Sequence, residues 1–356
     1  MTRPAQAVLD RSALGHNLAR IRSIAPGCGV MAVIKANAYG HGMIKVANAL
    51  RDADSFAVAC LDEALVLREA GITHPIVLLE GFFSPAEFPL LERHRLIAVI
   101  HHMDQLAMLE QANLAAPLSV WIKVDSGMHR LGIAPEKVSD MWQRLNTLKV
   151  NVLGFMTHLA NADSRDNPMT LQQLDCFTQA VDAYPSQRSV ANSAAILAWP
   201  QTHGDWVRPG IMLYGVSPFP DSVGRDHDLK AAMSLQSQLM AVNRYKRGDR
   251  IGYGGEWQCP EDMPVGVVAI GYGDGYPRHA KVGTPVLVNG KRVPLIGRVS
   301  MDMICVDLRS QPGARNGDPV CLWGSDLPVE EVAVCAGTIP YELLCRVTSR
   351  VSFRSD

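Results

Sequence analysis

The chain lacks the features that mark secreted, membrane-bound and nucleic-acid-binding proteins. Its first ten residues, "MTRPAQAVLD", contain no apolar segment of the kind found in signal peptides, and no run reaches about 18 uninterrupted apolar residues. The 34 lysines and arginines nearly balance the 35 aspartates and glutamates, and no block of five like charges occurs. We therefore expect a cytoplasmic protein that binds a small molecule rather than a membrane or a nucleic acid.

The eight cysteines include no C-x-x-C pair, which argues against a zinc ribbon and against a disulfide framework. We accordingly expect no bound metal. An apolar fraction of 47% and a charged fraction of 19% are typical of a globular protein. Because 356 residues exceed what a single core usually holds, the length predicts two domains.

Short apolar segments alternate with helical segments through the first 210 residues or so, which predicts parallel strands covered by helices. The apolar segments are 30–35, 56–60, 75–80, 96–100, 118–124, 152–158, 188–192 and 205–208. Among the helical segments, 10–21 has a clear apolar face, and Asp10 is placed to cap its start. Eight strands in about 200 residues favour an α/β chain with a (β/α)8 TIM-type barrel, although a doubly wound sheet is an alternative.

The later part of the chain has a different pattern, with short strands separated by turn residues. Asn289-Gly290 lies between "VLV" and "KRV", which predicts a hairpin with a type I' turn. The polar segment 221–230 predicts the domain boundary. We therefore expect an N-terminal barrel over residues 1–229 and a mostly-β domain over residues 230–356.

Charged and polar side chains follow the predicted barrel strands. They are Lys35, Arg130, His158, Asn192, Ser193 and Arg208. Taken singly, each has an ordinary structural explanation, such as a surface lysine or a hydrogen-bonded core histidine. Because the C-terminal ends of barrel strands surround one site, their coincidence predicts a shared cavity.

Lys35 ends the first predicted barrel strand in "AVIKANAYGHG". Burial disfavours a charged amine, and a neutral lysine is a nucleophile that condenses with aldehydes. After the eighth strand, the backbone N–H groups of Gly210 and Ile211 are placed to bind a phosphate, and Ser193 can add a hydroxyl. A reactive lysine beside a phosphate site predicts pyridoxal 5'-phosphate (PLP) as cofactor.

Six motifs extend this prediction along essentially the whole chain. They are "AVIKANAYGHG", "KVDSGMHRLG", "DWVRPGIMLYG", "IGYGGEW", "GYGDGYPR" and "GRVSMDM". In this order they resemble the bacterial PLP-dependent alanine racemases, with one departure, Gly273 where alanine is commoner. The resemblance implies interconversion of L-alanine and D-alanine by two acid/base groups on opposite faces of a substrate held by PLP as an imine.

The resemblance also implies the catalytic residues. Lys35 would hold PLP and act on one face of the substrate, and Tyr253 of the neighbouring subunit would act on the other. A phenol is a poor base near neutrality, so positive charge near it is needed. The family arrangement supplies His158 hydrogen-bonded towards Arg208. Arg208 would face the pyridine nitrogen of PLP, to which an arginine cannot hand a proton.

The remaining matches concern binding, and they imply a homodimer with shared active sites. The phosphate-binding set is Tyr39, Ser193, Gly210, Ile211 and Tyr341, and the substrate set is Arg130, Met301 and Tyr272. Lys123 matches a lysine that is often carbamylated, and pairing with Asp125 is the simpler alternative for it.

Other functions stay open at this stage. A racemase acting on serine or on many amino acids, and a PLP-dependent decarboxylase of the same architecture, are alternatives to an alanine racemase. A PLP carrier would lack the second domain. The biological role is either supply of D-alanine for peptidoglycan or alanine catabolism, since the chemistry is the same in both.

Overall fold

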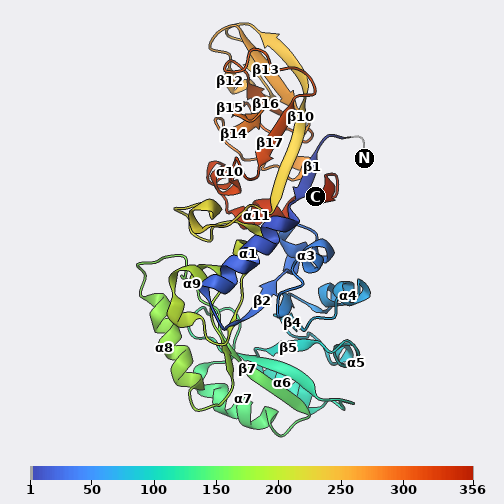
Figure 1. The fold of residues 1–356 in the computed structure, drawn as a ribbon, viewed down its shortest axis with the longest axis vertical. Coiled ribbons are helices and arrows are strands. Elements are labelled where there is room, and N and C mark those ends of the chain that lie inside the picture. Colours follow the sequence, from blue (N-terminus) through green and yellow to red (C-terminus); the bar gives the residue numbers. More distant parts are fainter. Residues whose placement is uncertain (1–2, 356) are drawn as a thin grey trace.

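The computed structural model describes residues 3–355 as two domains stacked along the long axis of the molecule (Figure 1). One domain contains a closed barrel of parallel strands, and the other is built on a mostly antiparallel sheet of eight strands. The first barrel strand pairs with both the second and the last, so the sheet closes. This confirms the predicted fold class and rules out the doubly wound sheet.

The barrel strands and their helices alternate along the chain. The strands are β2 (Gly29–Val33), β3 (Ser55–Val58), β4 (Ile76–Leu78), β5 (Ile97–Ile100), β6 (Leu118–Lys123), β7 (Val150–Met156), β8 (Gln187–Ser189) and β9 (Trp206–Val207). The main helices around them are α1 (Arg11–Ile24), α3 (Met43–Ala49), α4 (Leu61–Glu69), α5 (Phe88–Arg93), α6 (Met103–Glu110), α7 (Val138–Leu145), α8 (Met169–Val181) and α9 (Ser193–Ala198). As predicted, Asp10 caps α1 by accepting a hydrogen bond from the N–H of Ala13.

The barrel is filled with side chains and is not a pore. In β2, Met31 and Val33 belong to a cluster inside the barrel that also contains Trp121, which is 1% exposed. The alternate residues Val30 and Ala32 face the surrounding helices. This alternation follows from the period of two along a strand.

The second domain recruits both ends of the chain into one sheet. Its strands are β1 (Gln6–Leu9), β10 (Met233–Tyr245), β13 (Met263–Val268), β14 (Pro285–Val288), β15 (Lys291–Ile296), β16 (Ile304–Asp307), β17 (Pro319–Trp323) and β18 (Ser352–Ser355). A separate small hairpin pairs β11 (Arg250–Ile251) with β12 (Trp257–Gln258). Two helices, α10 (Val329–Ala336) and α11 (Pro340–Cys345), complete it.

The structure differs from the sequence expectation at the N-terminus. The sequence predicts a barrel over residues 1–229, but β1 lies between β10 and β18 in the second sheet. The hydrogen bonds of β1 are made to strands more than 200 residues away, which no local pattern reveals. The hairpin at Asn289-Gly290 formed as predicted, with φ of 50° and 73° and Val288 opposite Lys291.

The segment labelled α2 (Lys35–Tyr39) is a left-handed turn. Four consecutive residues, Ala36 to Tyr39, have φ between 51° and 55°. Such a conformation costs L-residues roughly 1–2 kcal/mol each, so neighbours must hold it. Glu63 accepts a hydrogen bond from the N–H of Ala36 at 2.7 Å, and the Asn37 side chain accepts one from the N–H of Met43 at 2.9 Å.

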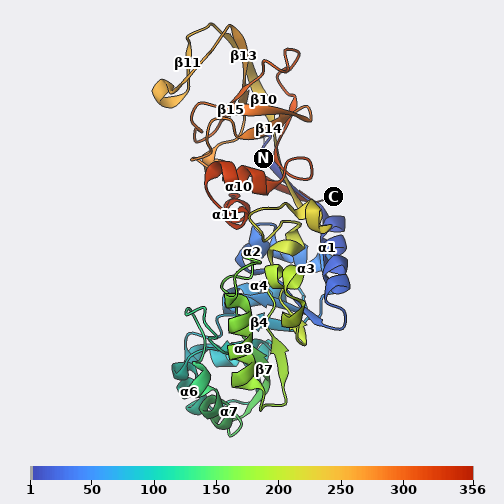
Figure 2. The ribbon, with the colours of Figure 1, turned by 90° about the vertical axis from the view of Figure 1, so that its left-hand side faces the viewer.

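This turn is also where the two domains touch. Helix α11 lies between the second sheet and the barrel, next to α2 (Figure 2). A Cβ built on Gly40, whose φ is +81°, would lie 2.1 Å from the carbonyl oxygen of Leu344 in α11. Glycine at position 40 therefore lets α11 approach the end of Lys35–Tyr39.

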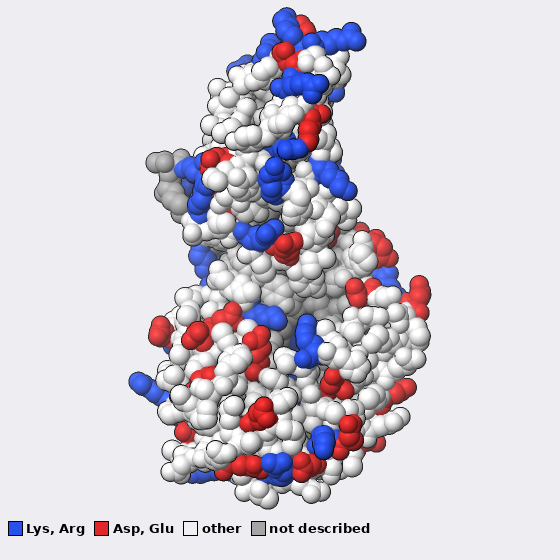
Figure 3. Space-filling view, turned by 180° about the vertical axis from the view of Figure 1, so that it is seen from behind, with Lys and Arg blue, Asp and Glu red and all other residues white. Residues whose placement is uncertain are grey.

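The face opposite to that of Figure 1 is hollowed at the waist between the domains (Figure 3). Basic side chains stand on the barrel side of this hollow, while acidic and basic groups are interspersed over the rest of the face. None of the helices within residues 3–355 combines the length and apolarity needed to cross a bilayer.

The contact at Gly40 predicts a specific loss of stability. Gly40→Ala should lower the free energy of unfolding by about 2 kcal/mol more than Gly27→Ala, because the added methyl group meets the backbone of α11. Gly27 is a matched control, since its φ is +80° and a Cβ there has no atom within 4 Å. Urea unfolding of both variants measures the difference, and equal losses would show that only the backbone angle matters.

Candidate active site

The barrel gathers the predicted cations at the C-terminal ends of its strands. Lys35 follows β2, Lys123 is the last residue of β6, and Arg208 follows β9. Burial, followed by the charges of Arg208, Lys123, Arg130 and Lys35, lowers the pKa of His158 well below its usual value. These four cations and one histidine therefore lie around a common site.

Arg208 is fixed in place by backbone carbonyls. Its Nη1 donates to the Ser189 carbonyl and hydroxyl oxygens, each at 2.7 Å, and its Nη2 donates to the carbonyl oxygens of Thr157 at 2.5 Å and Val190 at 3.2 Å. The residue is 6% exposed. Burial lowers the pKa of Arg208 to about 10, so the guanidinium is charged near neutrality.

His158 contacts Arg208 as the sequence suggested. The Nη2 of Arg208 lies 3.5 Å from Nδ1 of His158. Because the guanidinium can only donate and the imidazole is neutral near pH 7, Nδ1 is the acceptor and the ring proton is on Nε2. The histidine therefore offers one N–H group to a further partner.

Lys123 is partly buried among like charges. Burial and the charges of Arg208, Arg130 and Lys35 lower the pKa of Lys123 to about 8. Asp125 does not form an ion pair with Lys123; instead it accepts hydrogen bonds from the N–H groups of Gly127 at 3.1 Å and His129 at 3.0 Å. The simpler alternative for Lys123, a strand lysine paired with Asp125, is thus not what the structure contains.

The predicted phosphate-binding residues form a small cradle after β8 and β9. The hydroxyl of Ser193, the first residue of α9, accepts a hydrogen bond from the N–H of Gly210 at 2.9 Å. A Cβ on Gly210 would lie 2.6 Å from the hydroxyl of Tyr39, so only glycine leaves this space open. The N–H of the buried Ile211 has no acceptor within residues 3–355.

Aromatic side chains close the cradle on the side of the second domain. The ring of Tyr39 lies 6.0 Å from that of Tyr341 in α11 and 5.0 Å from that of Tyr214. Behind them, His41 stacks on Tyr214 at 4.4 Å, and Nδ1 of His41 lies 3.0 Å from the carbonyl oxygens of Ala38 and Tyr39. Burial lowers the pKa of His41 to about 4, so this histidine is a neutral support.

Sequence reasoning missed His41, Tyr214 and Glu63. All three hold the strained turn or the aromatic wall without being charged strand-end residues. The only available signal was the position of His41 and Tyr214 inside the "YGHG" and "LYG" motifs. Glu63, which accepts from the N–H groups of Ala36 and Ala59, lies on α4 and carries no motif signal.

The residues expected from the second domain are exposed. The exposed fraction is 67% for Tyr253, 50% for Met301 and 40% for Tyr272. Tyr253 lies between β11 and β12, which Figures 1 and 2 place towards the end of the second domain that is remote from the barrel. A single chain therefore does not bring Tyr253 and Lys35 together.

The chemistry of this site is set by its charge. Within residues 3–355, Lys35, Lys123, Arg130 and Arg208 form no ion pair with a carboxylate. Nowhere in residues 3–355 do three or more histidine, cysteine, aspartate or glutamate side chains form a group able to hold a metal ion. The site is suited to a ligand with several negative charges.

Comparisons with known proteins agree in both domains. Residues 9–218 match the alanine racemase N-terminal domain family, and residues 232–355 match the alanine racemase C-terminal domain family. An alanine racemase from Nitrosococcus oceani is 54% identical over 97% of this chain and 98% of its own length. A biosynthetic alanine racemase from Escherichia coli is 51% identical over 98% of both chains.

Solved structures give the same result. The biosynthetic alanine racemase from Pseudomonas aeruginosa superposes over 100% of both chains with a TM-score of 0.97 at 48% identity. The alanine racemase from Acinetobacter baumannii superposes over 100% of both chains with a TM-score of 0.95 at 41% identity. On these matches over its whole length, the chain belongs to the alanine racemase family.

Proposed function

We propose that this chain interconverts L-alanine and D-alanine with PLP as cofactor, using Lys35 and Tyr253 as the two acid/base groups. The observation that carries the proposal is that Lys35 lies with three other cations, Lys123, Arg130 and Arg208, next to the Gly210 cradle. Within residues 3–355 none of the four forms an ion pair with a carboxylate. When bound, PLP supplies an aldehyde that holds the substrate amine and a conjugated ring that accepts electrons from the α-carbon. The family membership supports this chemistry.

The residues present fit that cofactor. Its phosphate requires hydrogen-bond donors in a small space, and the N–H of Ile211 together with the hydroxyls of Tyr39 and Ser193 provides them. Tyr341 closes the cradle from α11. Lys35 follows β2, and its amine would hold the aldehyde carbon.

Arg208 and His158 prepare the site for proton transfer. Arg208 is charged near neutrality and held by carbonyl groups, so it can donate a hydrogen bond to a ring nitrogen but does not release a proton to it. His158 accepts from Arg208 through Nδ1 and presents its Nε2–H to the phenol of Tyr253 from the partner subunit. This hydrogen bond favours the basic, phenolate form of the tyrosine.

Arg130, Met301 and Tyr272 bind the substrate in this proposal. Arg130 makes no ion pair within residues 3–355, so its charge is free for the substrate carboxylate. The Met301 carbonyl accepts a hydrogen bond from the N–H of Gly273 at 2.9 Å, whereas the N–H of Met301 has no acceptor within the described residues. That N–H is a second candidate donor to the carboxylate.

The placement of Tyr253 supports a homodimer with shared active sites. One chain keeps Tyr253 and Lys35 apart. In this proposal each site therefore takes its second base from a second copy. The exposed Tyr253, Tyr272 and Met301 are the side chains that enter the partner's barrel mouth in this arrangement. The cytoplasmic location remains a prediction from the sequence, and both peptidoglycan supply and alanine catabolism suit the reaction.

The direct test is to add L-alanine to the PLP-loaded protein and follow the circular dichroism of the amino acid. We expect decay to zero, because enantiomers have equal free energies and the equilibrium mixture is racemic. Serine at the same concentration is the comparison substrate, and an equal rate with serine would indicate a broad-specificity racemase. Release of carbon dioxide would point to a decarboxylase, and no change would refute enzymatic racemisation.

Shared active sites predict complementation between two inactive variants. Lys35→Ala and Tyr253→Phe should each reduce kcat by about 10²–10⁴-fold, since each removes one proton-transfer group. In a mixed dimer, one site loses both groups and the other keeps both. Co-expression at equal levels should restore roughly a quarter of the wild-type activity per subunit.

The control for complementation is the double variant Lys35→Ala/Tyr253→Phe co-expressed with wild-type protein. This mixture gives mixed dimers in which each site has lost one group, so it yields no gain beyond the wild-type homodimer. Light scattering checks that all mixtures are dimeric. Absence of recovery in the complementing mixture would contradict a site shared between subunits.

Lys123 is proposed to bind carbon dioxide as a carbamate, whose negative charge would face Arg130. Only the neutral amine reacts, and with a pKa of about 8 the neutral fraction rises as the pH increases through that value. Two pH units lower, only about 1% of the amine is neutral. The ¹³C NMR spectrum in ¹³C-bicarbonate should show a carbamate signal above pH 8 that Lys123→Met abolishes and Lys149→Met retains. A signal present in both variants would contradict the assignment.

A further inference from the structure

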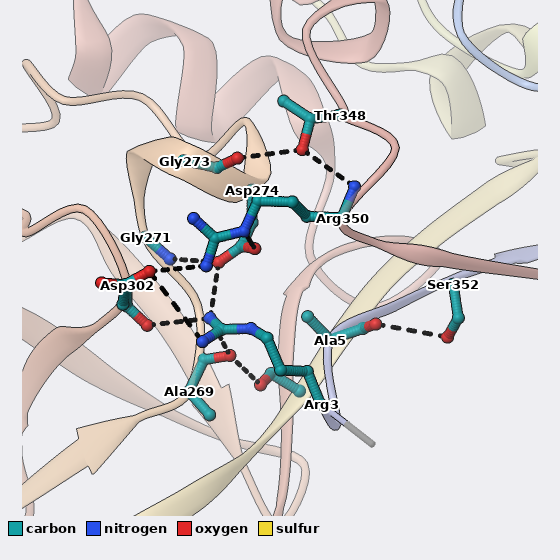
Figure 4. A network of polar contacts seen from close by, with 11 residues as sticks. Arg3, Ala5, Ala269, Gly271, Gly273, Asp274, Asp302, Thr348, Arg350 and Ser352 are labelled. Atoms are coloured by element: carbon teal, nitrogen blue, oxygen red, sulfur yellow. Dashed lines mark hydrogen bonds and ion pairs between the residues drawn. The ribbon is translucent and has the colours of Figure 1, made fainter. Parts of the chain in front are cut away.

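Two arginines from opposite ends of the chain hold the turn that carries Tyr272. Arg350 lies with Nε 3.2 Å from Oδ1 of Asp274, and its Nη2 donates to Oδ1 of Asp302 at 2.5 Å (Figure 4). Arg3 donates through Nη2 to Oδ2 of Asp274 at 2.8 Å and to the carbonyl oxygen of Asp302 at 3.0 Å. We call these four residues the two-arginine cluster.

The cluster is more than a pair of surface contacts. Asp274 is completely buried, and its Oδ2 also accepts a hydrogen bond from the N–H of Gly271 at 3.0 Å. Two arginines balance two aspartates, so the cluster has no excess charge with which to attract a substrate carboxylate. Exposed ion pairs contribute little to stability, but a buried carboxylate held by two guanidinium groups fixes the backbone around it.

The backbone around Asp274 is joined directly to that of Met301. The N–H of Tyr272 donates to the carbonyl oxygen of Ser300 at 3.0 Å, and the N–H of Gly273 donates to that of Met301 at 2.9 Å. Asp274 follows Tyr272 and Gly273 on one segment, and Asp302 follows Met301 on the other. The two arginines, which contact both aspartates, therefore hold the two segments together. A shift of either carboxylate would move the two exposed side chains relative to each other.

Gly273 makes room for the guanidinium of Arg350. A Cβ built on Gly273 would lie 2.4 Å from Nη1 of Arg350 and 3.1 Å from the carbonyl oxygen of Met301. An alanine methyl group at position 273 would clash with the guanidinium of Arg350 in its present position. The glycine that departs from the family motif therefore leaves the space that this guanidinium occupies.

We propose that Arg350 is a positioning residue. Its guanidinium lies against Gly273 and fixes the positions of Tyr272 and of the Met301 N–H, which face the substrate in the partner's site. The expected effect on substrate binding rests on the proposed function, whereas the structural coupling between Gly273 and Arg350 is independent of it. Loss of this grip weakens substrate binding more than proton transfer, because Lys35, Tyr253 and Arg208 are untouched by it.

The test combines kinetics with amide hydrogen exchange on the holoenzyme. Arg350→Met should raise KM for alanine on the order of 3- to 10-fold, leave kcat within about twofold, and speed exchange at the N–H groups of Tyr272 and Gly273. Arg350→Lys should recover part of the effect, since a single ammonium cannot grip both carboxylates as a guanidinium fork does. Arg354→Met is the control, because Arg354 makes no ion pair within the described residues.

Gly273→Ala supplies the second arm of a double-mutant cycle. Alone it should resemble Arg350→Met in both KM and exchange, because the methyl group displaces the guanidinium. In the Arg350→Met background it should add nothing further. If Arg350→Met does not fold, Gly273→Ala and Arg350→Lys carry the same comparison.

The outcomes separate this inference from the proposed function. Additive effects of the two substitutions, or unchanged exchange at Tyr272 and Gly273, would overturn it even if the enzyme racemises alanine. A fall in kcat with KM unchanged would also overturn it. A wild-type protein inactive on alanine would refute the proposed function, and non-additive exchange rates would then still support the grip of Arg350 on this turn.

Discussion

The site depends on an unbalanced set of positive charges around the mouth of the barrel. Lys35 follows β2, Lys123 ends β6 and Arg130 comes after it, and Arg208 follows β9. Within the described residues no carboxylate forms an ion pair with any of the four. Such an arrangement opposes folding unless each charge is solvated, fixed by carbonyl groups or met by an anionic ligand. Carbonyl oxygens accept hydrogen bonds from Arg208. The other three cations lack such fixed partners and are available to water or to anionic ligands. The fold therefore favours binding of an anion at this site.

The strained turn after β2 connects this charge to the second domain. Ala36 to Tyr39 adopt left-handed angles, and hydrogen bonds of the Glu63, Asn37 and His41 side chains stabilise this turn. The same turn aims Tyr39 at Gly210 and brings Gly40 against α11. Strain of this kind persists only where surroundings fix it, and here it places one tyrosine at the cradle and the barrel against its neighbouring domain.

The sequence predicted those features that depend on local pattern. Eight apolar segments were sufficient to predict the barrel, Asp10 to predict the start of α1, and Asn289-Gly290 to predict a hairpin. The strand-end rule predicted that Lys35, Arg130, His158 and Arg208 lie near one another, because closure of the barrel brings all strand ends to one face. Lys123 was implied only by the family resemblance.

Features that rest on distant partners were not predictable in this way. Strand β1 joins the second sheet through β10 and β18, and Glu63 supports a turn 27 residues away. The motif around Gly273 likewise does not reveal that Arg350 occupies the space beside it. In each case the missing information was a contact between segments far apart in the chain.

We propose that Lys35, and not Lys123, is the lysine that holds the cofactor. Lys123 is a chemically reasonable alternative, because burial and the surrounding cations lower its pKa to about 8 and so make part of its amine neutral. Borohydride reduction of the PLP-loaded protein, followed by peptide mass spectrometry, distinguishes the two. We expect a phosphopyridoxyl group on the peptide that contains Lys35 and on no other. A label on Lys123, or no label on Lys35, would contradict it.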